Sequence, residues 1–245
     1  MKVRAVGLWR LAHTAALIAR GMWIVATQFP HLSQDARDAH VQRWSRQMLA
    51  ALHIRLIVEG SYDPRGRLMV ANHVSWLDIL AINAAQPTRF VGKSELKSWP
   101  ILGWLIANTG TVFIERAKRR DAVRVVHHMT DVLRAGQLVT IFPEGTTGDG
   151  HQVLPFHANL LQAAIAADTP VQPVALRYGD AHFEVSQAAA YVSETNIWQS
   201  LWRVAMARHL RARITFLPVQ PPLDERRALA GALRQAIEAR LQTGD

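Results

Sequence analysis

From residue 53 onwards, short segments rich in apolar and β-branched residues alternate with helical segments, and this alternation limits the possible folds most strongly. The pattern predicts strands at 54–60, 68–73, 89–93, 111–116, 137–145, 170–176 and 212–217. It predicts helices at 76–84, 121–136, 156–167 and 223–241. Strands that alternate with helices in this way typically form a parallel sheet. We therefore expect an α/β fold, with a largely parallel central sheet and helices on both faces.

The composition excludes several classes of site. The 245 residues include no cysteine, which removes thiolate nucleophiles, disulfides and cysteine-ligated metals. The remaining metal candidates, His127–His128 and His151 with His157, lack the spacing and the supporting ligands of a metal site. Apolar residues make up 49% of the chain, so it can bury a full core. We expect no metal and no cofactor.

The first 52 residues differ in pattern from the remainder of the chain. Residues 3–29 are mostly apolar, but Arg10 and Arg20 interrupt them, and each would cost roughly 2.5–3.5 kcal/mol at the centre of a bilayer. On a helical wheel the basic residues fall within an arc of about 80°, opposite an apolar side. The basic arc comprises Lys2, Arg10, His13 and Arg20, and the apolar side comprises Leu8, Leu11, Ala15, Ala19 and Met22. We expect residues 1–52 to form amphipathic membrane-anchoring helices and residues 53–245 to form the α/β domain. A core helix and a secretory signal are the alternatives for residues 3–29.

The charge of the chain favours a lipid surface as partner. Lysine and arginine number 28 against 19 aspartate and glutamate, a net charge of +9. A nucleic-acid-binding protein is also basic, but here aliphatic runs and tryptophans interrupt the basic stretches. These tryptophans are Trp9, Trp23, Trp198 and Trp202. Such a sequence is typical of binding to anionic lipids. We expect membrane lipids, and no nucleic acid, as partners.

A histidine and an aspartate stand where the second predicted strand gives way to a helix, in NHVSWLD at 72–78. On one uninterrupted helix His73 and Asp78 would lie about 140° apart and could not meet. They can meet if His73 lies in the loop and Ser75 caps a helix that begins at Trp76. A carboxylate on one imidazole nitrogen fixes the tautomer and leaves the other nitrogen free as a general base. The alternatives are a purely structural histidine, and a capping box in which Asp78 only caps the helix.

Four sequence blocks, in order, resemble those of the glycerolipid acyltransferases, and bacterial 1-acylglycerol-3-phosphate acyltransferases in particular. They are NHVSWLD (72–78), GTVFIER (110–116), FPEGTT (142–147) and VQPVAL (171–176). The resemblance implies an α/β fold with an N-terminal membrane-associated element. It also implies that His73 deprotonates a lysolipid hydroxyl, with Asp78 as its orienting partner. That hydroxyl would attack the thioester of acyl-CoA or of acyl carrier protein, which serves as substrate rather than cofactor.

The resemblance also assigns residues to the acceptor. Arg116, at the end of the second block, is linked to binding of the acceptor head group, and a guanidinium can grip a phosphate through two hydrogen bonds. Lys93 is a second cation at a neighbouring strand end. In the third block, Gly145 would let the backbone approach the substrate, Glu144 would bind it or organise the cations, and Thr146 completes the match. Thr147 departs from the pattern, because many members carry arginine there.

These observations predict a membrane-associated acyltransferase at the cytoplasmic face of the cell membrane. The first candidate acceptor is 1-acylglycerol 3-phosphate (lysophosphatidic acid), which would yield phosphatidic acid in phospholipid biosynthesis. Lyso-ornithine lipid, or another lysolipid, is the alternative acceptor. A non-catalytic protein that binds anionic lipids is the alternative of another class, but surface binding alone does not require four ordered blocks.

Overall fold

A seven-stranded sheet forms the centre of the protein in the computed structural model, which describes residues 2–99, 102–114, 119–192 and 195–243. The strands are β1 (Arg55–Glu59), β2 (Leu68–Ala71), β3 (Arg89–Lys93), β4 (Val112–Ile114), β5 (Val139–Ile141), β6 (Val171–Gly179) and β7 (Arg211–Phe216). Their order is β1-β7-β6-β2-β5-β3-β4. Every neighbouring pair is parallel except β6 with β7. The largely parallel sheet predicted from the sequence is therefore confirmed.

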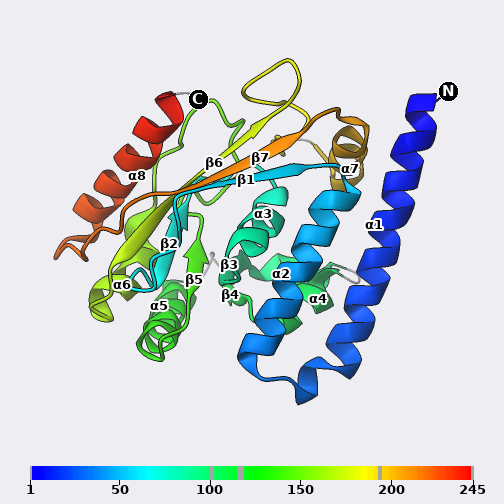
Figure 1. Ribbon diagram of the computed structural model, residues 1–245. Helices are drawn as coiled ribbons and strands as arrows, with labels where there is room; N and C mark the ends of the chain where they lie inside the picture. Colours follow the sequence, from blue (N-terminus) through cyan, green and yellow to red (C-terminus); the bar gives the residue numbers. More distant parts are fainter. Residues whose placement is uncertain (1, 100–101, 115–118, 193–194, 244–245) are drawn as a thin grey trace.

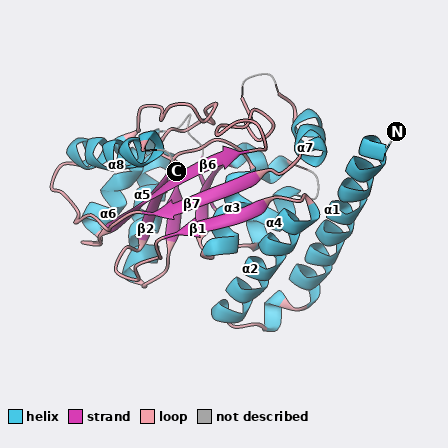
Figure 2. Cartoon of the chain, turned by 45° about the horizontal axis from the view of Figure 1, so that its top comes forward, coloured by secondary structure: helices cyan, strands magenta, loops and turns pink. Residues whose placement is uncertain are grey.

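Helices cover both faces of this sheet (Figures 1 and 2). They are α1 (Lys2–Thr27), α2 (Gln34–Ala51), α3 (Leu77–Ala85), α4 (Leu102–Asn108), α5 (Arg119–Arg134), α6 (Gln162–Ala166), α7 (Ile197–Met206) and α8 (Arg226–Gln242). Alternate residues of β2 explain the two layers, because successive strand side chains point to opposite faces. Met69 packs into the core that includes Leu77 of α3. Leu68 packs into the other core, with Met129 of α5 and Leu233 of α8.

Several elements differ from the expectation. β5 ends at Ile141 rather than at residue 145, because the chain turns at Phe142, whose carbonyl accepts the amide of Gly145. The helix expected at 156–167 is a 3-10 turn, Ala158–Leu161, followed by the short α6. Helix α7 was not expected. A capping box between Asn196 and Gln199 fixes its start.

The N-terminal helices α1 and α2 lie beside the helical layer that contains α3, and a short 3-10 turn, Phe29–His31, joins them (Figure 1). The side of α1 that meets the protein carries small and mid-sized residues, and Gly21 admits the indole of Trp44, which donates to the Leu17 carbonyl at 2.9 Å. Leu17, Met48 and Leu49 share one core with the sheet. None of the helices in the described part of the chain is long and apolar enough to cross a membrane.

Arg10 does not lie on the outward polar arc that the helical wheel predicts. Its guanidinium points into the protein and donates to the carbonyls of Ala205 (2.8 Å) and Ala207 (2.9 Å), where α7 ends. A cation there satisfies carbonyls that the helix leaves unpaired. The wheel gives angles only, so it could not show which side of α1 meets the protein.

Candidate active site

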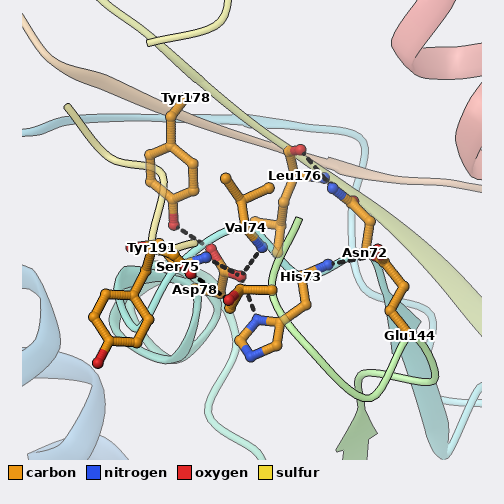
Figure 3. Close-up of polar contacts among 10 residues, drawn as sticks. Asn72, His73, Val74, Ser75, Asp78, Glu144, Leu176, Tyr178 and Tyr191 are labelled. Carbon is orange, nitrogen blue, oxygen red and sulfur yellow. Dashed lines mark hydrogen bonds and ion pairs between the residues drawn. The ribbon is translucent and has the colours of Figure 1, made fainter. Parts of the chain in front are cut away.

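The structure brings His73 and Asp78 together at the carboxyl end of β2 (Figure 3). The imidazole Nδ1 lies 2.7 Å from Asp78 Oδ2. Asp78, in the first turn of α3, is completely buried, whereas the His73 side chain keeps 20% of its surface exposed. The second ring nitrogen points away from the carboxylate in Figure 3. This geometry holds the Nδ1–H tautomer and leaves Nε2 free to accept a proton.

Three further donors hold the Asp78 carboxylate. Oδ2 accepts from the backbone amides of Val74 (2.7 Å) and Ser75 (3.0 Å), and Oδ1 accepts from the Tyr178 hydroxyl (2.7 Å). Burial and the neighbouring Asp78 charge raise the pKa of Tyr178 well above its ordinary value, so the phenol stays protonated and donates. Hydrogen bonds of this kind fix the position of the carboxylate.

The expected role of Ser75 as the cap of a helix beginning at Trp76 is wrong. Helix α3 begins at Leu77, and among the described residues the buried Ser75 hydroxyl has no hydrogen-bond partner. Asp78 instead accepts the amides of Val74 and Ser75, so one carboxylate stabilises the turn and also orients the imidazole. Asp78 can therefore stabilise this turn and orient His73 at the same time.

A stack of aromatic rings covers one face of the imidazole. The rings of His73 and Phe142 lie 4.1 Å apart, with 14° between their planes. Phe90 of β3 continues the stack at 5.9 Å from Phe142. Because Asp78 holds the ring at its edge and Phe142 at its face, the direction of Nε2 is fixed by two independent contacts.

Glu144 is hydrogen-bonded to the backbone of the loop that carries His73. Its Oε1 accepts the His73 amide at 2.7 Å, and its Oε2 accepts the Leu154 amide at 3.0 Å. Burial raises its pKa to about 7, although both amides favour the charged form. The sequence suggested that Glu144 binds the acceptor or organises cations. In the structure both carboxylate oxygens accept backbone amides, so Glu144 ties the loop after β5 to His73, and its contact with the acceptor stays a prediction.

The residues that follow Glu144 close a turn beside the dyad. Gly145 has φ +74°, a left-handed conformation that glycine adopts without strain. Thr146 is exposed, and the Thr147 hydroxyl donates to the carbonyl of Tyr191. Tyr191 in turn donates its amide to the Val74 carbonyl at 3.0 Å. Thr147 thus links two loops around the catalytic segment.

Of the two predicted cations, Lys93 lies in the described part of the chain. Lys93 is the exposed last residue of β3, two strands from β2. Arg116 lies outside the described residues, and the strand before it, β4, runs parallel to β3. Within the described part of the chain, no group of three His, Asp or Glu side chains could hold a metal ion.

Sequence reasoning missed Tyr178 and the stacking role of Phe142. It also missed that the Asn72 side chain donates to the Leu176 carbonyl (2.9 Å) and accepts the Leu176 amide (2.8 Å), which fastens the end of β2 to β6. The only sequence signal was a tyrosine and an asparagine at the ends of otherwise apolar strands. Such residues become informative only when their partners are known.

A profile of the Acyltransferase family matches residues 55–177, about half of the chain, including His73, Asp78 and Glu144. This chain belongs to the acyltransferase family. The 1-acyl-sn-glycerol-3-phosphate acyltransferase of Neisseria meningitidis is 39% identical to it over 209 residues, which cover 84% of this chain and 82% of that protein. The lyso-ornithine lipid O-acyltransferase of Pseudomonas aeruginosa is 31% identical over 241 residues, covering 96% of this chain and 93% of that protein.

The fold of this acyltransferase is also that of a solved structure. The crystal structure of the 1-acyl-sn-glycerophosphate acyltransferase PlsC from Thermotoga maritima superposes with a TM-score of 0.75 at 20% identity. The match covers 99% of this chain and 95% of the other, so it includes the N-terminal helices as well as the sheet. The predicted enzyme class is confirmed by the family, and the non-catalytic alternative loses its support.

Proposed function

We propose that this acyltransferase moves a fatty acyl group from a thioester, acyl-CoA or acyl carrier protein, to the free hydroxyl of 1-acyl-sn-glycerol 3-phosphate. The observation that carries the proposal is the His73–Asp78 pair, in which Nδ1 is hydrogen-bonded to Asp78 and Nε2 has no hydrogen-bond partner among the described residues. An Nε2 held in one direction is what a general base needs to accept a proton from a hydroxyl. The name of the Neisseria meningitidis relative supports the choice of acceptor.

The chemistry follows from the dyad. The acceptor oxygen attacks the thioester carbonyl carbon and forms the new C–O bond, while His73 Nε2 takes the hydroxyl proton. Asp78 stabilises the imidazolium. The tetrahedral intermediate then collapses, the C–S bond breaks, and the thiol leaves with the proton from Nε2. A thioester is already activated, so one base suffices without an acyl-enzyme, in agreement with a chain that has no cysteine.

We assign the acceptor head group to the cationic edge of the sheet. Lys93 is exposed there, and Arg116 follows β4 in the sequence. A phosphate dianion favours such cations. No metal and no cofactor take part in this proposal.

Lyso-ornithine lipid is the second candidate acceptor, and a specific observation favours it. Thr147 is neutral, and its hydroxyl is bound to the Tyr191 carbonyl, so this position offers no cation to a phosphate. The name of the Pseudomonas aeruginosa relative, which matches 96% of this chain, supports the same acceptor.

We place the enzyme on the cytoplasmic face of a membrane, with α1 in the lipid head-group region. The outward side of α1 carries Leu8, Trp9 (59% exposed), Trp23 (60% exposed) and several alanines, with exposed His13 beside Trp9 and with exposed Arg20, whereas Arg10 is withdrawn into the protein. An exposed apolar side bearing tryptophans is typical of a helix that lies in a bilayer surface. This location would bring the lipid acceptor and the water-soluble thioester to one site.

The experiment is a two-by-two assay of the purified protein. Lysophosphatidic acid and lyso-ornithine lipid, with matched acyl chains, are each offered with acyl-CoA and with acyl carrier protein thioester, and products are identified by mass spectrometry. We expect diacylated product from lysophosphatidic acid at the higher kcat/KM. Preference for lyso-ornithine lipid would establish the second candidate. Release of free fatty acid without any acylated lipid would contradict acyl transfer to lipids.

A further inference from the structure

Helix α7 presents an unusual side to solvent. Trp198 and Trp202, four residues apart, are 76% and 39% exposed, and Gln199 and Arg203 are exposed beside them. We call these four residues the α7 outer face. The opposite side of the helix, with Ser200, is buried. Two neighbouring tryptophans on one side of a helix expose a large apolar area to water, which is unfavourable. Tryptophan favours the boundary between lipid and water.

The charge around α7 suits an anionic surface. The chain has no aspartate or glutamate between residues 195 and 223. Arg203 lies on the α7 outer face, and Arg208 and His209 are exposed just after the helix. A bilayer with anionic lipids attracts such residues, by about fivefold in affinity for each lysine or arginine near the surface.

Helix α7 is attached to both α1 and the catalytic loop. The N-terminal half of α1 lies beside α7 in both ribbon views, and Arg10 joins the two helices through the carbonyls of Ala205 and Ala207. On its buried side, the Ser200 hydroxyl accepts the indole N–H of Trp76 at 3.0 Å. Trp76 lies two residues before Asp78. This hydrogen bond links α7 directly to the turn that holds the dyad.

We propose that α7 is a second membrane-contact element, whose outer face lies on an anionic phospholipid bilayer and holds the catalytic loop at the level of the head groups. The inference rests on the proposed location at a membrane, and it adds a site of contact in the C-terminal half of the chain. In this arrangement α1 and α7 both hold the enzyme at the bilayer.

The absence of cysteine allows a direct test with single labels. Ala16→Cys on the exposed side of α1, Gln199→Cys on α7 and Gln235→Cys on α8 are each labelled with a nitrobenzoxadiazole fluorophore. Gln235 is the matched control, because it is an exposed helical glutamine on the opposite face of the sheet. The Gln199 variant loses the capping-box bond from the Asn196 amide to the residue 199 side chain and keeps the bond from the residue 199 amide to the Asn196 side chain. The vesicles contain phosphatidylcholine, with or without phosphatidylglycerol.

We expect anionic vesicles to shift the emission of the labels at 16 and 199 to the blue and to leave the label at 235 unchanged. A shift at 16 without one at 199 would overturn the role of α7 and leave the α1 attachment intact. No shift at any position would contradict the membrane location itself. A blue shift of all three labels, or an equal shift of the label at 199 with neutral vesicles, would overturn the proposal that α7 binds specifically to an anionic bilayer.

A kinetic test distinguishes a membrane-binding role of Trp198 and Trp202 from a purely structural one. Trp198→Ala/Trp202→Ala should weaken binding to anionic vesicles by at least about tenfold, because two large apolar groups no longer enter the interface. With acceptor embedded in vesicles, the apparent KM should rise by a similar factor. With a short-chain acceptor dissolved in water, kcat/KM should stay at the wild-type value. An equal loss with both acceptors would overturn the proposal.

Discussion

Substituting Asp78 by asparagine removes a charge and preserves nearly all of the shape of the site. In the Asp78→Asn variant, the amide oxygen of the new side chain can take the place of Oδ2 and accept from His73 Nδ1 and from the amides of Val74 and Ser75. The amide nitrogen then faces the Tyr178 oxygen, which can accept a hydrogen bond as well as donate one. The tautomer of His73 is retained, so the substitution isolates the charge.

The size of the effect follows from the short contact. With Nδ1 and Oδ2 at 2.7 Å, the centres of the imidazolium and carboxylate charges lie about 4 Å apart, which at an effective dielectric constant of about 20 corresponds to roughly 4 kcal/mol. The imidazolium is only partly formed in the transition state. The substitution therefore raises the activation free energy by only part of this amount. We expect Asp78→Asn to lower kcat by about 10²–10³-fold. KM should change little, because the carboxylate is completely buried and does not reach the acceptor.

Steady-state assays of thiol release, with each substrate varied in turn, measure this effect. Urea unfolding of both proteins is the control, and we expect a loss of about 1–2 kcal/mol in the free energy of unfolding, because charged hydrogen bonds become neutral ones. A folded Asp78→Asn enzyme with kcat close to that of the wild type would refute the assignment of Asp78 to the imidazolium.

Three further predictions concern other residues of the proposed site. Tyr178→Phe leaves Oδ1 of Asp78 without its donor, so urea unfolding should show a loss of about 1–3 kcal/mol, and kcat should fall with KM unchanged; a raised KM alone would contradict this. The Glu144 pKa of about 7 lies above the ordinary value of 4.5, so the folded state binds the extra proton. Protonated Glu144 therefore stabilises the folded state at low pH by roughly 3 kcal/mol, and this stabilisation is lost as pH rises through about 7. In urea unfolding at pH 5 and pH 8, Glu144→Gln should lack this component, and an identical pH dependence in both proteins would refute it. Arg116→Ala should raise KM for the acceptor more than for the donor, whereas impaired donor kinetics alone would move Arg116 to the donor site.

Local sequence patterns were sufficient to predict the architecture. Strands β1, β3 and β7 fall within one residue of the expected boundaries, since short apolar runs between turn residues specify strands. The His73–Asp78 pair could also be predicted from the local sequence. The two residues are five positions apart, and the turn between them decides whether they meet.

Contacts between residues that lie far apart in the sequence could not be predicted. Tyr178 lies 100 residues from Asp78, and Ala205 lies 195 residues from Arg10. Nothing in the local sequence distinguishes such partners from ordinary core or surface residues. The helical wheel of α1 grouped Arg10 with outward basic residues, because it lacked the position of the α7 carbonyls. Ser75 was assigned to a cap for a similar reason, since the competing Asp78 carboxylate already held the turn.

The central claim is that His73 is the base that activates a lysolipid hydroxyl toward a thioester. Its most direct test compares the wild type with His73→Ala, matched in thermal unfolding midpoint, by counting diacylated lipid and released thiol in one reaction. We predict equal amounts of lipid product and thiol from the wild type, and a decrease of at least about a hundredfold in both from His73→Ala. A folded His73→Ala enzyme that forms diacylated lipid at the wild-type rate would contradict the claim.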